Sequence, residues 1–556
     1  MSKFQPRPKA PAVANISALS TLDPPSRSET PMSQQGTRLT PIDPTSSRAT
    51  QYLIRRTLCS QLGDKGPIDE ILPPLTSSND VDVELYAYIA IIIREFVHTW
   101  YQNITPDTIF VEEVIQIIAH CTRALEQRMR KVDLEGLIFD ELPELLEIHF
   151  QAYQTSTQAL HPPPFRTDSR TIYHSLCPFP ALSPVPDPEI KHAVEQQAEN
   201  EAAYRQLLVQ GVMAVLLPTE DLESDCLTSL VGQIFSEMII GNGIGGKASE
   251  PWLLWEGITK TAEVIQSKLP NSKAQVRLER SNSVSSDHAF DVISGSSTKG
   301  WRILLSAEKL FWLALQYAFF TFTTIRFIII TIATSSSLPT RNPHDTKITG
   351  SASFQGGLET PNYIRTKRTA SISNPSLKEP IIKMKIWSCV SSLLDVDTRM
   401  PWMSATISMS QWFALTGPGE VGNTDGMVDK ILSNFIQTHV LDPTLIPLIL
   451  RTARAAVFPS NTLAPARAIP TATEQLVIRQ RCAETLLSLV PTRLLDVYFG
   501  PDGDRRVREV EDVLDMFGDT YCNKHLLYGV VELIVVRLLP ELAEKGVEEL
   551  LNERLG

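Results

Sequence analysis

The hydrophobic period is the feature that most limits what this chain can fold into. In several long segments, the apolar residues recur three or four positions apart, which is the spacing of one face of an α-helix. No segment shows a convincing alternation of apolar and polar residues, the pattern expected of a β-strand with one buried face. Amphipathic helices bury their apolar stripes against one another, so we predict an all-α fold of packed helices.

The N-terminal half begins with an unusually apolar helix. Residues 84–104 are almost continuously apolar, which predicts a helix covered on most of its circumference. Thr105, Pro106 and Asp107 then supply a capping hydroxyl, a proline for the first helical position and an acid in the first turn, so a second helix should run to about Lys131. A third helix, which tolerates or kinks at Pro143, and several further helices are predicted at 134–153, 189–217, 220–240, 252–269, 381–396, 425–457, 471–499, 505–518 and 522–553.

Composition separates these helices from linkers. Residues 1–50 contain 8 Pro, 8 Ser, 6 Thr and one aromatic residue, too little apolar surface to offset the entropy of ordering, so they are predicted to form a disordered tail. A Ser-rich linker is expected at 270–300, and a Ser- and Pro-rich linker with excess basic charge at 335–380. The first thirty residues contain no apolar run typical of a secretory signal.

Charge and cysteine content exclude some classes of protein. The net charge of −12 argues against nucleic-acid binding through bulk charge. Seven cysteines, an odd number without paired spacing, are typical of a protein from a reducing compartment rather than of a disulfide-linked scaffold.

Motifs of chemical function are weak. The run Gly241–Lys247 has the spacing of a dinucleotide-binding loop, but the residues before it have helical period and Ala248 replaces the hydroxyl that a P-loop needs, so we interpret it as a glycine-rich helix end. The sequence has no C-x-x-C, H-E-x-x-H or G-x-S-x-G motif. We therefore predict no catalytic residue, metal site or cofactor, and a protein that is not an enzyme.

The most apolar segment is 310–334, and hydropathy alone does not decide its role. Its 25 residues are long enough to cross a bilayer. Thirteen Leu, Ile and Phe residues contribute roughly −6 kcal/mol to insertion, whereas Arg326 opposes it by about 2.5 kcal/mol, and Gln316 and five threonines remove most of the remainder. Within a predicted helix at 301–334, this segment can cross a membrane, lie in its interface or line an apolar cavity. A single crossing is excluded if the regions before and after it pack together.

Two parts of the chain resemble known domains. REFVHTWY at 94–101, ITPD at 104–107, HCTRALEQR at 120–128, KVDL at 131–134 and LPTEDLESDC at 217–226 resemble the PXA (PX-associated) domain, which we place at 51–269. NKHLLY at 523–528 and VRLLPEL at 536–542 are similar to the C-terminal domain of sorting nexins, which we place at 381–556. Neither a PX nor an RGS module is evident between the two, so phosphoinositide recognition by a PX pocket is not implied. The polar residues 1–50 also lack the membrane hairpin found in the family.

The resemblance implies membrane trafficking on the cytosolic face of endosomes, the vacuole or the endoplasmic reticulum. It also implies that the two domains form one helical body around an apolar cavity that carries lipid. The leading hypothesis is a peripheral protein that binds, and is able to transfer, phospholipid. The alternatives are a trafficking adaptor or tether that binds proteins through helical grooves, an integral protein anchored by 310–334, and an ordinary helical core without a ligand. The choice of lipid, organelle, protein partners and oligomeric state stays open.

This hypothesis names two sets of residues. Apolar side chains expected to line or gate the cavity are Ile89, Ile92, Phe96, Trp100, Phe311, Leu315, Phe319, Phe322 and Ile329. Basic side chains expected to contact anionic headgroups, at about 1 kcal/mol for each well-placed residue, are Arg341, Lys347, Arg365, Lys367 and Arg368.

Overall fold

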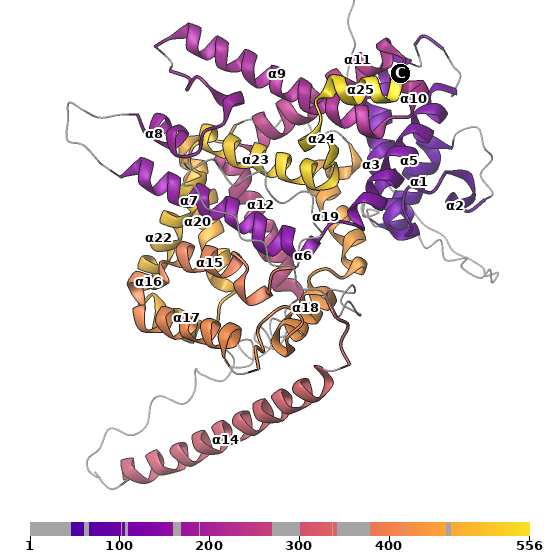
Figure 1. The fold of residues 1–556 in the computed structure, drawn as a ribbon. Helices are drawn as coiled ribbons and strands as arrows, with labels where there is room; N and C mark the ends of the chain where they lie inside the picture. Colours follow the sequence, from indigo (N-terminus) through magenta and orange to yellow (C-terminus); the bar gives the residue numbers. More distant parts are fainter. Residues whose placement is uncertain are drawn as a thin grey trace, which may run out of the picture.

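The structure is a computed structural model of the chain, and the residues it describes form only helices and connecting segments (Figure 1). The predicted all-α fold is therefore confirmed. The described residues are 46–59, 66–101, 103–105, 109–158, 168–187, 189–268, 301–335, 337–341, 378–417, 419–462 and 469–556. Most of the predicted tail and both predicted linkers lie outside these ranges.

The helices of the N-terminal half follow one another with short connections. Most are α-helical, but three segments are π-helical (η1, η2 and η4) and one is a 3₁₀-helix (η3). In chain order they are α1 (Ser47–Leu58), α2 (Ile68–Ile71), α3 (Asn79–Ile92), η1 (Ile93–Val97), α4 (His98–Tyr101), α5 (Ile109–Met129), α6 (Leu134–Gly136), η2 (Leu137–Glu141), α7 (Leu142–Thr157), α8 (Ser169–Leu176), η3 (Pro180–Leu182), α9 (Lys191–Leu216), α10 (Thr219–Leu222), α11 (Asp225–Gln233), η4 (Ile234–Ala248) and α12 (Pro251–Lys268).

The remaining helices begin with the long α14. They are α14 (Trp301–Ser335), η5 (Ile381–Lys383), α15 (Ile386–Leu394), α16 (Val396–Arg399), α17 (Pro401–Thr416), α18 (Met427–His439), η6 (Pro443–Leu445), α19 (Ile446–Val457), η7 (Pro459–Asn461), α20 (Ala472–Ser488), α21 (Thr492–Tyr498), α22 (Gly503–Leu514), η8 (Asp515–Phe517), α23 (Thr520–Leu538), α24 (Glu541–Glu544) and α25 (Val547–Leu555).

Two predicted boundaries need correction. Helix α1 begins at Ser47, inside the predicted tail, because the Ser46 hydroxyl accepts a hydrogen bond from the Ala49 amide and so caps the helix. The predicted disturbance at Pro143 takes the form of the π-helical stretch η2, which lies just before the proline in a helical run that continues from Leu134 to Thr157.

The glycine run lies at the end of a helix, as predicted, but it is itself helical. Residues Gly241–Lys247 continue the π-helix η4, which ends only at Ala248. At Gly245 an added Cβ would lie 2.3 Å from the Tyr528 hydroxyl, so the absence of a side chain lets α23 pack closely on η4. These glycines serve helix packing, a role that depends on residues far along the chain.

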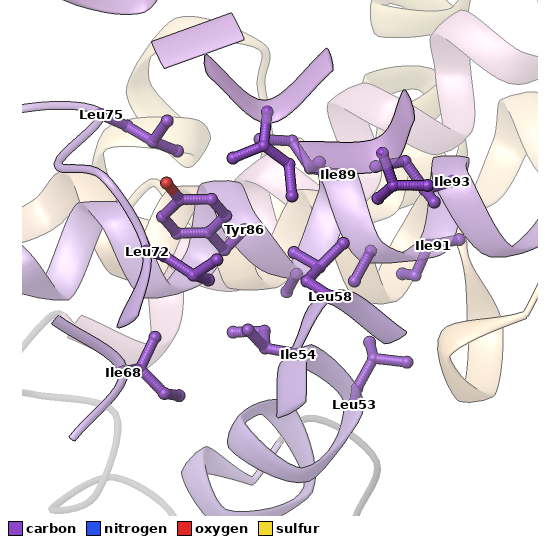
Figure 2. Packing of buried hydrophobic residues seen from close by; sticks show 14 of the residues in the cluster. Leu53, Ile54, Leu58, Ile68, Leu72, Leu75, Tyr86, Ile89, Ile91 and Ile93 are labelled. Atoms are coloured by element: carbon purple, nitrogen blue, oxygen red, sulfur yellow. The ribbon is translucent and has the colours of Figure 1, made fainter. Parts of the chain in front are cut away.

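The first hydrophobic core lies among α1, α3 and α5. Figure 2 shows Ile54 and Leu58 of α1 facing Tyr86 and Ile89 of α3. Ile54 and Ile91 are fully buried there. The apolar helix predicted at 84–104 is therefore covered on this side by protein side chains.

The other large cores combine both halves of the chain. One contains Val209 and Met213 of α9 together with Tyr521 and Tyr528 of α23. Another joins Phe150 of α7 and Trp252 and Trp255 of α12 to residues of α20, α22 and η8. The two halves therefore fold as one body.

A buried ion pair also joins the two halves. Glu84 of α3 and Arg454 of α19 are 1% and 0% exposed, and their side chains approach to 3.0 Å. Arg454 also donates a hydrogen bond of 2.8 Å to the hydroxyl of Thr50 in α1. Since the chain before α14 packs on the chain after it, both lie on one side of any membrane, which excludes a single crossing by 310–334.

Candidate functional site

Helix α14 is the longest helix of the described residues and presents an apolar surface. Figure 1 shows it beside the helical body, and its most extensive contact with the body is to α18. Every described side chain from 311 to 334 is exposed. Phe311, Phe319 and Phe322 are 63%, 66% and 64% exposed. An apolar helix exposed in this way needs a covering that the described body does not supply.

The predicted cavity residues on α14 share this exposure. Leu315 and Ile329 are 49% and 60% exposed, as on the rest of the helix. They face solvent instead of the interior of the body. The structure thus leaves these α14 residues exposed and does not place them around an enclosed cavity.

The predicted cavity residues on α3 and η1 fall into two environments. Ile89 belongs to the core in Figure 2 and is 9% exposed. Ile92 and Phe96 lie on the outer side, at 43% and 37% exposure. The side chain of Trp100 lies outside the described residues. The α3 and α14 candidates do not form one buried cluster, because Ile89 lies in the core whereas Phe311, Leu315, Phe319, Phe322 and Ile329 are exposed.

The predicted role of Arg341 in contacting headgroups is wrong. Its side chain is 2% exposed and forms ion pairs with Glu135 at 2.8 Å and Asp429 at 2.9 Å. The guanidinium joins the segment after α14 both to the N-terminal half and to α18, so it is not available to a membrane surface. The other four predicted basic contacts, Lys347, Arg365, Lys367 and Arg368, lie outside the described residues.

The electrostatics of this cluster favour the charged forms. Burial lowers the pKa of Arg341, but the hydrogen bonds and charge of Asp429 outweigh it, and the net shift is upward. Burial likewise raises the pKa of Glu135, but the hydrogen bond from Ser433 and the charge of Arg341 bring it below its ordinary value. The ion pairs of Arg341 therefore have a structural role, since they link Glu135 to Asp429 of α18.

A second polar cluster joins α9, η4 and α23. Glu201 accepts hydrogen bonds from Tyr528 at 2.6 Å and from Lys524 at 3.0 Å, and lies 3.2 Å from Arg205. Burial raises the pKa of Glu201, but the hydrogen bond from Tyr528 and the charge of Lys524 make the net shift downward. The three charged groups and the Tyr528 hydroxyl are thus paired with one another. Because they come from α9 and α23, the cluster holds the two halves of the chain together.

Sequence reasoning missed one exposed element, the helix α17. It contains no charged residue, and none of its residues is buried. Trp402, Met409, Trp412 and Phe413 are each more than half exposed. It has no charged face against which an apolar face could be recognised in the sequence, so hydrophobic period gave no signal; the lack of charge over sixteen residues was the available sign.

Comparison with known proteins identifies the domain in the N-terminal half. The described residues form an all-α body with an exposed apolar surface. Residues 78–261 match the PXA domain family. These residues therefore form a PXA domain. The chain is similar to "PXA domain protein 1" of Schizosaccharomyces pombe, with 30% identity over 138 residues, 25% of this chain and 25% of that protein. The match thus spans a quarter of the curated relative, and no solved structure matches the chain.

The two remaining findings concern the C-terminal region and the membrane. The similarity of 381–556 to the sorting-nexin C-terminal domain stays a prediction. Among the helices of the described residues, none combines the length and apolarity needed to cross a membrane.

Proposed function

We propose that this chain is a non-enzymatic, peripheral membrane protein that binds phospholipid and transfers it in membrane trafficking. The observation that carries the proposal is the exposure of α14 over its described side chains. The PXA domain supports the trafficking context. The cytosolic face of endosomes, the vacuole or the endoplasmic reticulum is the proposed location.

The energetic argument compares α14 in water with α14 in lipid. Phe311, Phe319 and Phe322 each leave more than three fifths of the residue exposed. If a phenylalanine offers roughly 200 Å² for burial, each leaves about 120 Å² to be covered, which stabilises the covered state by about 3 kcal/mol at about 25 cal/mol per Å². Partial insertion into the interfacial region of a bilayer recovers part of this free energy for several residues at once.

The nature of the surface favours lipid over a folded protein partner. Exposed apolar residues occur around α14 and not only along one stripe, whereas a helix that docks in a protein groove needs only an i, i+3, i+4 and i+7 face. Acyl chains make non-directional contacts of about 0.8 kcal/mol per buried CH₂, so they can cover such a helix without matched polar groups.

Mass spectrometry tests lipid binding directly. Protein purified without detergent should carry stoichiometric phospholipid in native spectra, and a liposome assay should show exchange of that lipid. A clean, lipid-free monomer would overturn the proposal. Bound lipid without exchange would restrict it to binding, and loss of sorting without either would favour the adaptor or tether.

A variant of α14 tests the surface itself. Replacing Phe311, Phe319 and Phe322 with serine should reduce co-sedimentation with vesicles by about tenfold or more, because the apolar area available for insertion is lost. The matched control is Thr321→Ser with Thr324→Ser, two exposed positions of the same helix that contribute little apolar area. Equal sedimentation of variant and control would remove α14 from the proposal.

A further inference from the structure

Helix α17 is a second unusual surface element, separate in sequence from α14. Its sixteen residues, PWMSATISMSQWFALT, carry no charge, and none is buried in the body. A surface helix of a soluble protein normally presents charged residues to water on its outer face. The outer face of α17 instead presents tryptophan, methionine and phenylalanine.

The exposed residues share one side of the helix. Trp402, Met409 and Phe413 are spaced at i, i+7 and i+11, which places them within about 40° of one another around the axis, and they are 69%, 70% and 59% exposed. Trp412, at 66% exposure, flanks this stripe. We call these four residues the α17 stripe.

The other side of α17 is attached to the body. The Gln411 side-chain amide donates a hydrogen bond of 3.4 Å to the Ile382 carbonyl. The Ala414 carbonyl accepts one of 2.8 Å from the Gly422 amide. The helix is thus held on one side, with the α17 stripe directed away from these attachments.

The distribution of tryptophan supports a membrane interface as the partner. Of the six tryptophans with described side chains, Trp252 and Trp255 are buried in the core. The four exposed ones lie on α14, α15 and α17, namely Trp312, Trp387, Trp402 and Trp412. Tryptophan is enriched at the headgroup level of membranes, where its ring meets apolar chains and its N–H meets water.

The size of the α17 stripe argues against a second copy of the chain as its partner. If each of the four side chains offers roughly 200 Å² and exposes about two thirds of it, the stripe presents about 500 Å². A stable protein interface needs about 800 Å² on each partner. Shallow insertion into a bilayer needs no such matched area.

The position of α17 relative to α14 is the third argument for a membrane as the partner. Figure 1 shows α17 and α18 at the end of the body next to which α14 lies, and α14 contacts α18. A membrane that covers α14 is therefore met by this end of the body. We infer that the α17 stripe is a charge-independent membrane-docking element that inserts into the lipid interface together with α14; this inference rests on the proposed function.

Vesicle binding of the full-length chain tests the inference. The variant Trp402→Ser, Met409→Ser, Phe413→Ser should bind phosphatidylcholine vesicles about tenfold more weakly or worse, with an equal loss on vesicles that contain anionic lipid, because no charge of α17 is involved. The matched control is Leu476→Ser with Val477→Ser on α20, which are 55% and 64% exposed. The control should bind as the unchanged chain does.

Hydrogen exchange on the unchanged chain provides a measurement that does not depend on a variant. Amides of 401–416 should become more protected when phosphatidylcholine vesicles are added. If α14 or a second copy covers the stripe in solution, vesicles will leave this protection unchanged or lower it, and the inference is overturned.

The outcomes separate this inference from the proposed function. If the unchanged chain fails to bind vesicles and carries no lipid, the proposed function fails. If it binds vesicles but the α17 variant binds equally well, only the inference about α17 fails. A melting curve equal to that of the unchanged chain is expected for the variant, because none of the three residues is buried.

Discussion

Acidification should weaken the packing of α23 against the PXA domain, because buried histidines lie between them. His149 of α7 and His525 of α23 are 2% and 6% exposed. The His149 Nε2–H donates to the Met516 carbonyl at 3.1 Å, so its Nδ1 accepts from the Tyr173 hydroxyl at 2.7 Å. The neutral ring thus satisfies both neighbours, and a second proton would displace the hydrogen bond from Tyr173.

Burial sets the direction of both shifts. It lowers the pKa of His149 to about 4, against a smaller opposing effect of the Met516 carbonyl. Burial, together with the nearby His174 and His149, lowers the pKa of His525 to about 3. The ordinary value is 6.5. Both histidines therefore stay neutral in the folded protein at pH 5, whereas they are mostly protonated in the unfolded chain.

The other titratable groups around these rings do not offset the effect. Tyr173 lies on α8, and Tyr521 and Cys522 lie on α23; burial raises the pKa of all three, so these groups stay neutral between pH 5 and 7.5. His174 has a pKa lowered by burial, which adds to the effect in the same direction.

The magnitude follows from proton linkage. Because the folded pKa values are depressed, their contribution to stability is fully present above pH 6.5 and declines as the pH falls below it. At pH 5 the unfolded chain gains about 2 kcal/mol per histidine from protonation that the folded state cannot match, or about 4 kcal/mol for the pair. That is a large part of the roughly 5–15 kcal/mol by which typical domains are stable.

Urea unfolding between pH 7.5 and 5, followed by circular dichroism, measures this loss. The control variant His149→Gln with His525→Asn removes both titrating groups, so its free energy of unfolding should change by about 4 kcal/mol less over the same range. It will be less stable than the unchanged chain at pH 7.5, since the ring contacts are lost, but the comparison concerns slopes. Parallel pH dependence in the two proteins would refute the reasoning.

Two further predictions concern the joints that hold the body together. Arg341→Met should lower the free energy of unfolding by about 3–5 kcal/mol in the same urea assay, since it leaves two buried carboxylates without their cation; a change below 1 kcal/mol would contradict the assigned role. Gly245→Ala should destabilise the chain by about 1–3 kcal/mol, because the new methyl group meets the Tyr528 hydroxyl. The control is Gly257→Ala in α12, where no atom lies within 4 Å of the added Cβ. This substitution should raise the free energy of unfolding by about 0.5–1 kcal/mol. Equal effects of the two substitutions would count against the packing argument.

The fold could be predicted from sequence because helical period is a local signal. Apolar residues three and four apart located α5, α9 and the helical run from α3 to α4 to within a few residues of their ends. The π-helical turns were not predictable from the same pattern. In η4 the glycines allow a close approach of Tyr528, which is 283 positions from Gly245, so no local window contains the reason for them.

The candidate site was predictable only where it depends on a single segment. The composition of 310–334 identified it as the most apolar run, but its exposure became evident only in the structure. Arg341 was misassigned because its environment is set by Glu135 and Asp429, which are 206 and 88 positions away. From the sequence alone, a basic residue in a polar segment is expected to be solvated. Only the fold shows that two carboxylates surround Arg341.

Helix α17 shows how exposure can carry information that hydrophobic period does not. Its residues Trp402, Met409 and Phe413 would be ordinary core residues if another helix covered them, and sequence cannot distinguish the two situations. In the folded body they stay uncovered although the neighbouring cores are well packed. Leaving this much apolar area in water is unfavourable for the isolated chain. The inferred docking of the α17 stripe to a membrane would remove this cost, because acyl chains would replace water at this face.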